Sequence, residues 1–313
     1  MAASDRRPGI LARIGDTRLV ALRRLVPDGA ARILLKLESE NPTGSMKDRM
    51  ALAMVEAAEV DGRLAGGGAV VEYTGGSTGV SLALVCAVKG HPLDIVTSDA
   101  FAPEKLDHMR ILGARLTIVA SEGGRMTEKL TRDMVEAARA ITARTGAFWT
   151  DQLRNTDQLV AYRAMADEIA DGAGGRVDAF VESVGTAASL RGTGEALRAR
   201  DPAVRVVAVE PDESPVLSGG AAGAHRIDGI GAGFVVPLWR SDTADRIERV
   251  STEEARATQL RLAREEGLFG GTSTGANVAA ALRVARAVGP GGTVVTVMCD
   301  TGMKYLRGLA GTS

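Results

Sequence analysis

The chain has 313 residues, of which 45% are apolar and 25% charged, as in a globular protein with a large core. Its 38 basic and 39 acidic residues nearly cancel, which argues against nucleic acid or an anionic membrane as a partner. The two cysteines have neither disulfide nor metal-ligand spacing, and no leader or long apolar span is apparent, so we expect a cytoplasmic protein without a metal site.

Short β-branched runs alternate with amphipathic stretches along most of the chain. We expect strands at 69–73, 93–97, 115–119, 177–181, 204–209 and 293–298. We expect helices at 79–89, 103–112, 126–144, 157–170, 187–200, 252–266 and 276–288. Residues 214–241 are rich in glycine and alanine without a regular pattern, which indicates a long functional loop. The alternation predicts an α/β fold whose mostly parallel, twisted sheets are flanked by helices on both faces.

One stretch, residues 41–50, follows a short apolar run and precedes a helical pattern. Pro42 and Gly44 predict a turn there, and Ser45 stands where a helix N-cap belongs. Lys47 then falls in the first turn of a helix, where the backbone dipole is already positive and acidic residues are preferred. This pattern alone fits a solvated surface lysine. Because the neighbouring residues are small, it also fits a lysine whose amine is used chemically.

Four loops combine glycine with small or hydroxyl residues. They are residues 74–79 (Thr-Gly-Gly-Ser-Thr-Gly), 185–189 (Gly-Thr-Ala-Ala-Ser), 229–234 (Gly-Ile-Gly-Ala-Gly-Phe) and 271–275 (Gly-Thr-Ser-Thr-Gly). Free N–H groups at helix starts bind anions, and glycines let a ligand approach the backbone closely. Each loop taken singly is at least as typical of a tight turn. Four in one chain favour convergence of helix N-termini on one anionic ligand.

Two of these loops also match the G-x-S-x-G nucleophile elbow of α/β hydrolases, with Ser77 or Ser273 as the nucleophile. That fold needs an acid and then a histidine later in the chain. None of the three histidines follows Ser273. For Ser77 the histidine at 225 is possible, but no clear acid or oxyanion segment accompanies it. An α/β serine hydrolase is therefore kept as the rival hypothesis of another class.

Taken together, these segments resemble the pyridoxal-phosphate-dependent cysteine synthase and cystathionine β-synthase family, in the tryptophan-synthase-β fold group (fold type II). Residues 41–49 look like its cofactor-lysine motif, and residues 225–234 resemble its H-x-I-x-GIGxGF segment. Residues 185–189 resemble its GTGGT phosphate loop, with two glycines replaced by alanine, and residues 271–276 resemble its GxSSGA motif. Residues 148–152 resemble the strand end that delivers a substrate-binding glutamine.

The resemblance implies that pyridoxal 5′-phosphate is bound as a Schiff base to Lys47, whose freed amine is the general base at the substrate's Cα. It places Ser273 at the cofactor's pyridine nitrogen, and a neutral hydroxyl there favours β-elimination over transamination or racemisation. The cofactor phosphate is expected on Gly185, Thr186, Ala187, Ala188 and Ser189. The substrate is expected on Thr74, Gly75, Gly76, Ser77, Thr78, Gln152 and Gly229.

The chain departs from the family in the substrate loop, which usually reads TSGNTG and here reads TGGSTG. Ser77, which is expected at the cofactor as well as at the substrate, replaces the asparagine that hydrogen-bonds the cofactor's 3-oxygen, and Gly75 replaces a serine near the substrate carboxylate. The N–H groups of the loop are kept, whereas the two side-chain contacts are lost. We therefore expect this loop to change the choice of substrate.

The resemblance implies β-replacement on an activated L-serine, either O-acetyl- or O-phosphoserine, through an α-aminoacrylate. Sulfide is the default nucleophile, with L-cysteine as the product. The altered loop leaves room for a diamino acid or thioether amino acid synthase, or for a β-eliminating lyase. The family also implies a homodimer. In each subunit residues 1–40 and 150–313 would form the larger, cofactor-binding domain, and 41–149 a smaller mobile domain that closes over the substrate.

Overall fold

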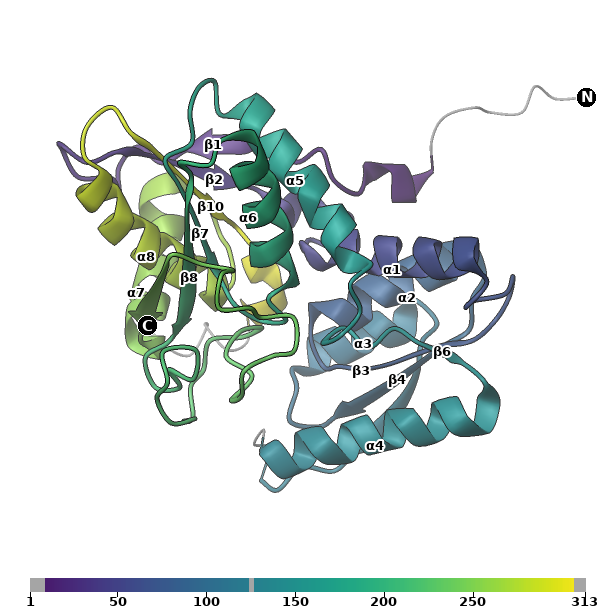
Figure 1. Cartoon of the computed structure of the whole chain (residues 1–313). Helices are drawn as coiled ribbons and strands as arrows, with labels where there is room; N and C mark the ends of the chain where they lie inside the picture. The colour runs from purple at the N-terminus through teal and green to yellow at the C-terminus, as the bar shows by residue number, and fades with distance from the viewer. Residues whose placement is uncertain (1–8, 124–126, 307–313) are drawn as a thin grey trace, which may run out of the picture.

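The computed structural model describes residues 9–123 and 127–306, which build two sheets with helices on both faces of each (Figure 1). The larger sheet has the strand order β1-β2-β10-β7-β8-β9. In that order its strands are Leu19–Ala21, Arg32–Lys36, Thr293–Val297, Ala179–Ser183, Arg205–Pro211 and Arg246–Val250. Neighbouring strands run parallel, except that β1 is antiparallel to β2 at one edge.

Two helix pairs cover the larger sheet. One face packs against α7 (Thr252–Glu266) and α8 (Thr272–Val288), and the other against α5 (Gln158–Gly172) and α6 (Ala188–Arg200). Successive side chains of a strand point to opposite faces, so Phe180 of β7 faces α5 and α6 while Val181 faces α8. Burial on both faces explains why the central strands read as continuous apolar runs.

The smaller sheet is parallel throughout and has the order β5-β4-β3-β6. Its strands are, in that order, Arg115–Val119, Leu93–Ser98, Val70–Tyr73 and Phe148–Trp149. One face packs against α1 (Lys47–Asp61), α2 (Ser77–Lys89) and α3 (Pro103–Ile111), and the other against α4 (Glu128–Thr145). Helix α1 also contacts α5, so it joins the layers of the two sheets (Figure 1).

Local capping explains several helix boundaries. The hydroxyl of Thr127 accepts a hydrogen bond from the N–H of Leu130 at the start of α4, and Ser251 does the same for Glu254 at the start of α7. Helix α7 ends at Glu266, and the next residue, Gly267, has a φ of 72°, in the left-handed region that favours glycine. Within the described residues there are also three short 3-10 helices: η1 (Ile10–Arg13), η2 (Glu38–Glu40) and η3 (Gly302–Tyr305).

The predicted elements are present, and the strand at 115–119 and the helix at 252–266 have the predicted bounds. Helix α8 begins four residues before the predicted start, because its small first-turn residues mask the apolar period. The predicted start of α4 at residue 126 lies outside the described residues. Strands β1, β2 and β9 were not predicted. Strand β1 has only three residues, β2 reads only as a short apolar run, and the charged residues that alternate in β9 (Arg-Ile-Glu-Arg-Val) suit an edge strand. Residues 214–241, all described, contain no helix or strand.

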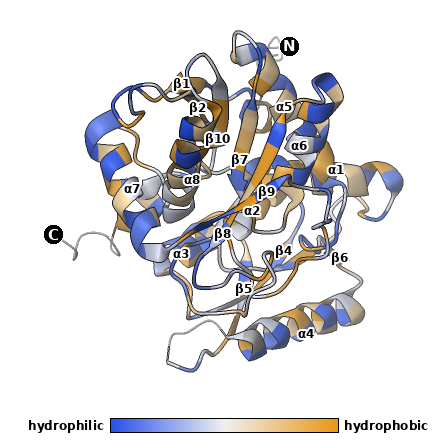
Figure 2. Ribbon diagram, turned by 60° about the vertical axis from the view of Figure 1, so that its left-hand side comes forward, coloured by the Kyte–Doolittle hydropathy of each residue, from blue (hydrophilic) through white to orange (hydrophobic). Residues whose placement is uncertain are grey.

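The hydropathy of the ribbon follows these layers. In Figure 2 the strands at the centre are mostly hydrophobic, and along the outer helices α4 and α7 hydrophilic segments alternate with hydrophobic ones. No helix within residues 9–123 and 127–306 combines the length and the apolar character that crossing a bilayer requires.

Candidate active site

Lys47 is the first residue of α1, and a buried carboxylate on the next residue holds this helix start in place. Asp48 accepts hydrogen bonds from the Thr43 N–H at 2.7 Å, from the Thr43 hydroxyl, and from the Ser81 hydroxyl of α2 at 2.6 Å. Burial raises the pKa of Asp48, against the lowering effect of these three donors. Through Asp48, the first turn of α1, which carries the half-buried Lys47, is thus fixed to both α2 and the preceding turn.

The predicted N-cap at Ser45 is wrong by one residue. The cap position is Met46, which makes no capping side-chain bond, and the Ser45 hydroxyl instead accepts the Lys47 N–H at 3.2 Å. The reason is Gly44, whose φ of 74° turns the chain so that Ser45 forms an isolated β-bridge with Asp300. Residues 41–47 are called the lysine loop. The bridge brings the segment that follows β10 of the larger sheet against this loop.

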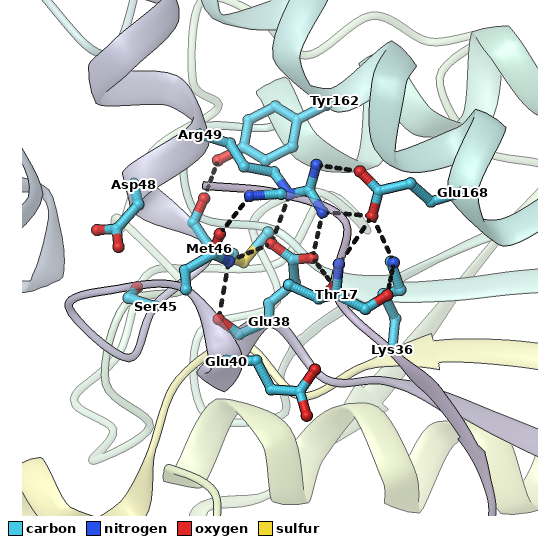
Figure 3. A network of polar contacts seen from close by, with 12 residues as sticks. Thr17, Lys36, Glu38, Glu40, Ser45, Met46, Asp48, Arg49, Tyr162 and Glu168 are labelled. Atoms are coloured by element: carbon cyan, nitrogen blue, oxygen red, sulfur yellow. Dashed lines mark hydrogen bonds and ion pairs between the residues drawn. The ribbon is translucent and has the colours of Figure 1, made fainter. Parts of the chain in front are cut away.

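A buried ion network holds the other side of the same helix turn (Figure 3). Arg49 donates to both oxygens of Glu38, at 2.7 and 2.8 Å, and to both oxygens of Glu168 in α5, each at 2.7 Å. Lys36 of β2 also donates to Glu168, at 2.5 Å. Although burial raises the pKa of Glu168, its bonds to Arg49 and Lys36 lower that pKa to about 2. The start of α1 is therefore clamped to β2 and α5.

The loop 74–79 and Gln152 lie in contact. The hydroxyl of Thr78 donates to the Gln152 side-chain oxygen at 2.8 Å, and the Gln152 amide donates to the Tyr73 carbonyl at 3.2 Å. Beneath them, the fully buried Glu72 carboxylate accepts the Gln152 N–H at 2.9 Å and the Thr150 hydroxyl at 2.6 Å. Burial raises the pKa of Glu72 to about 7. Sequence reasoning missed Glu72, which lies inside a strand rather than at its end.

Gly75 lies directly beneath an aromatic ring. A Cβ built at residue 75 would stand 1.8 Å from ring atoms of Phe101, a distance at which no side chain fits. At the neighbouring Gly76 a Cβ would meet nothing within 4 Å. The glycine at 75 is thus matched to Phe101, which comes from the turn between β4 and α3. Phe101 was not among the predicted site residues.

Asp300, just after β10, connects the loops from both sheets. Its carboxylate accepts the Ser77 hydroxyl at 3.3 Å and the Tyr305 hydroxyl at 2.6 Å, and its carbonyl accepts the Gly271 N–H at 3.3 Å. Together with the backbone bridge to Ser45, these contacts place the lysine loop, the 74–79 loop and the 271–275 loop around one residue. Asp300 is 5% exposed, and its Oδ1 has no hydrogen-bond partner among the described residues.

Two lysines join this cluster. The Lys304 ammonium donates to the Ser77 hydroxyl at 3.3 Å, and burial, with the nearby charges of Lys105 and Lys47, lowers the pKa of Lys304. Lys105 of α3 lies 4.4 Å from the centroid of the Tyr305 ring and 3.6 Å from the carboxylate of Asp228. Ser77, which replaces the family asparagine, is therefore engaged by protein groups on both sides. The position of Asp300 after a predicted strand was the signal that should have drawn attention to this segment.

The 185–189 loop follows β7 and opens α6, which begins at Ala188. A Cβ at Gly185 would stand 2.5 Å from the Gly229 carbonyl oxygen, and the Gly231 N–H donates to the Val184 carbonyl at 3.1 Å. The second and third glycine loops therefore touch. Ala187 caps α6 with a φ of 69°, a left-handed conformation that strains a residue other than glycine. This is one of the two positions where the family loop has glycine.

The 271–275 loop forms the beginning of α8, where Ser273 is 5% exposed. Burial raises the pKa of the nearby Cys299 thiol to about 12, against a small lowering effect of the Ser273 hydroxyl. The neighbouring Thr272 hydroxyl accepts the Asp228 N–H at 3.0 Å, which ties this loop to the segment around Gly229. All four predicted loops thus lie in contact, directly or through Asp300.

Among the described residues, neither elbow serine has the catalytic base that the hydrolase hypothesis requires. Ser77 bonds to Asp300 and Lys304, and among the described residues no histidine is hydrogen-bonded to either elbow serine. His225 pairs its Nε2 with the Gly231 carbonyl at 2.9 Å. His91 lies between the Gly68 carbonyl and a glutamate of α1.

Comparison with known proteins agrees with this geometry. The model of the family described as pyridoxal-phosphate dependent enzyme matches residues 10–300. The probable cysteine synthase of Bacillus subtilis is 39% identical over 297 residues, which cover 94% of each chain. The crystal structure of O-ureido-L-serine synthase is similar with a TM-score of 0.89 and 36% identity, over 97% of this chain and 95% of the other. A cysteine synthase from Entamoeba histolytica gives a TM-score of 0.89 and 33% identity, over 98% and 92%. The chain belongs to the family of pyridoxal-phosphate-dependent enzymes, in its cysteine synthase-like branch with the tryptophan-synthase-β-like fold.

Proposed function

We propose that this enzyme replaces the β-substituent of an O-activated L-serine, such as O-acetyl- or O-phosphoserine, by a small nucleophile. Sulfide, with L-cysteine as the product, is the first candidate. The observation that carries the proposal is the convergence of the Lys47 loop, the 74–79 loop and the 271–275 loop on Asp300. Relatives named cysteine synthase, which cover nearly the whole chain, support the same reaction.

The residues present fit pyridoxal phosphate. Lys47 offers a primary amine at a fixed helix start, and the first-turn N–H groups of α6 have no acceptor within the helix, which suits a phosphate. Ser273 offers a neutral hydroxyl for the ring nitrogen. Buried oxygens of Asp300 and Ser183 are without hydrogen-bond partners among the described residues, as expected where a polar ligand completes the site.

When bound, pyridoxal phosphate supplies the electron sink that weakens the Cα–H bond and lets the β-substituent leave. In this chain Lys47 takes the Cα proton and returns it, which is supported by its position at the start of α1 and by its charge acting on Glu182 and Cys299. The Thr74–Thr78 backbone and Gln152 hold the substrate carboxylate, and Gly229 lines the same site. The Thr78–Gln152 bond orients this amide before substrate arrives.

The altered substrate loop bears on the choice of nucleophile. Phe101 over Gly75, and Ser77 bound to Lys304 and Asp300, replace the side chains that relatives use in this loop. One solved relative is named O-ureido-L-serine synthase, so nucleophiles other than sulfide occur within this structural group. The second candidate function is therefore β-replacement with a nitrogen, oxygen or thioether-forming nucleophile, and β-elimination is the default outcome when water intercepts.

We further propose a cytoplasmic homodimer whose subunits divide into residues 1–40 with 150–313 and residues 41–149. Strands β3 to β6 all fall within the second segment, which supports the division, although α1 contacts helices of both parts. Light scattering coupled to size-exclusion chromatography tests the dimer. Small-angle scattering with and without an amino-acid ligand tests closure of the smaller part.

The reaction is tested by crossing O-acetyl-, O-phospho- and O-succinyl-L-serine with sulfide, hydroxyurea, diamines and thiols, with products identified by mass spectrometry. We expect a new Cβ–S, Cβ–N or Cβ–O bond in at least one pair, together with release of the activating group. Pyruvate and ammonia from every pair would instead identify a β-eliminating lyase. Turnover of simple esters by an enzyme that lacks visible absorbance would restore the hydrolase hypothesis.

A further inference from the structure

A glutamate lies buried directly beneath the proposed phosphate loop. Glu182 of β7 is 1% exposed and stands three residues before Gly185. It shares the strand face of Phe180, toward α5 and α6, so its carboxyl group lies below the start of α6. The Ser189 hydroxyl acts as a donor that lowers the pKa of this carboxyl group, while Oε2 has no partner among the described residues. A buried carboxylate with one oxygen unpaired is costly unless it is protonated or a ligand changes its surroundings.

The charges around Glu182 come from four elements. Lys47 of α1 acts in favour of the ionised form, and Glu38 of η2, itself paired with Arg49, acts against it. Tyr162 of α5 and Cys299 after β10 also face it, and both have raised pKa values, so they are neutral at pH 7. Burial outweighs the Ser189 bond and the Lys47 charge, and raises the pKa of Glu182 to about 7. The group therefore changes its protonation state near neutral pH.

A phosphate ester at residues 185–189 would bring negative charge next to this carboxylate. Like charges in a low-dielectric region disfavour each other strongly, so one must be neutralised. The Ser189 hydroxyl has a single hydrogen, which it gives either to Glu182 or to the phosphate. If Glu182 takes a proton from solvent on the oxygen that faces Ser189, it becomes the donor to Ser189, and the Ser189 hydrogen is freed for the phosphate.

We infer that Glu182 is a proton-accepting positioning residue of the phosphate loop, which takes up one proton when a phosphate ester binds and makes Ser189 a donor to it. This inference rests on the proposed phosphate role of residues 185–189. It adds that phosphate-ester binding is coupled to proton uptake by a residue that does not touch the ligand.

The test is calorimetric titration of the cofactor-free enzyme at pH 8 in buffers of different ionisation enthalpy, which counts the protons taken up on binding. Pyridoxal 5′-phosphate is compared with pyridoxal, which lacks the phosphate. With pyridoxal 5′-phosphate, we expect the wild type to take up close to one proton more than Glu182→Gln. With pyridoxal, we expect the two proteins to take up the same number of protons. A phosphorus NMR titration identifies any proton taken by the phosphate itself.

Glu210→Gln is the matched control. Glu210 is a buried glutamate on the neighbouring strand β8, but both its oxygens are paired, with Leu217 and Ser218. We expect its proton count to equal that of the wild type. The affinity for pyridoxal 5′-phosphate should also fall as pH rises above 7, by up to tenfold per pH unit more in the wild type than in Glu182→Gln.

Equal proton uptake by wild type and Glu182→Gln would overturn the inference while leaving the proposed function intact. Failure of the wild type to bind pyridoxal 5′-phosphate would overturn the proposed function itself. Should Glu182→Gln not fold, the infrared difference spectrum of the wild type decides. A protonated-carboxyl band that appears with pyridoxal 5′-phosphate but not with pyridoxal supports the inference, and its absence contradicts it.

Discussion

The ring of Phe101 occupies the space that a side chain at residue 75 would need, since a Cβ there would lie 1.8 Å from the ring. The glycine at residue 75 and the aromatic ring that covers it therefore depend on each other. A serine at residue 75, as in the family motif, can fit only if the ring of Phe101 moves.

Gly75→Ser is expected to lower stability by about 1–3 kcal/mol, as overpacking of a filled site does. Gly76→Ser is the control, because a Cβ there meets nothing within 4 Å and stability should hardly change. Gly75→Ser combined with Phe101→Ala should recover most of the loss and change which activated serine is preferred. Thermal unfolding and a substrate panel measure both effects. If Gly75→Ser alone is as stable as the wild type, the packing account is wrong.

Gln152→Ala is expected to raise KM for the amino-acid substrate by roughly tenfold to a hundredfold, the effect of losing a hydrogen bond to a carboxylate. The visible absorbance of the bound cofactor should not change, since Gln152 is bonded to Thr78 and Tyr73 rather than to Lys47 or Ser273. Steady-state kinetics and absorption spectra separate the two outcomes. An unchanged KM would remove Gln152 from the substrate site.

Arg49→Lys is expected to destabilise the protein by about 3–5 kcal/mol, because an ammonium cannot pair with both oxygens of Glu38 and of Glu168 at once. Arg18→Lys is the matched control, because Arg18 pairs with Glu40 at the solvent-exposed surface, where an ion pair hardly changes stability. Urea unfolding compares the two variants. Similar stabilities for both would show that the buried network does not hold the start of α1.

Glu72 gives a defined pH dependence. Its folded pKa of about 7 lies above the ordinary 4.5, so between these values the folded state binds more protons than the unfolded state. Its contribution to stability therefore falls as pH rises from about 4.5 to about 7, by an amount on the order of 3 kcal/mol. Glu72→Gln should be free of this slope. Unfolding free energies of both proteins at pH 5 and pH 8 measure the difference. An equal change between the two pH values in wild type and Glu72→Gln would contradict the raised pKa.

The sequence predicted those parts of the molecule that depend on local pattern. The strand–helix alternation predicted the sheets and most helices, and glycine with small residues at helix starts predicted loops that do touch. It missed Asp300, Lys304 and Phe101, because their roles depend on contacts between segments far apart in the chain, such as Ser77 with Asp300. Glu72 and Glu182 were missed for another reason: a glutamate inside an apolar strand carries no local sign of what its carboxylate accepts.

The central claim is that Lys47 carries the cofactor, and one measurement tests it most directly. The purified enzyme with bound pyridoxal phosphate is reduced with borohydride and digested, and the modified peptide is located by mass spectrometry. The account predicts a pyridoxyl group on Lys47, and a Lys47→Ala protein that is colourless and unmodified. A pyridoxyl group on Lys304 or Lys105, or visible absorbance that survives Lys47→Ala, would contradict it.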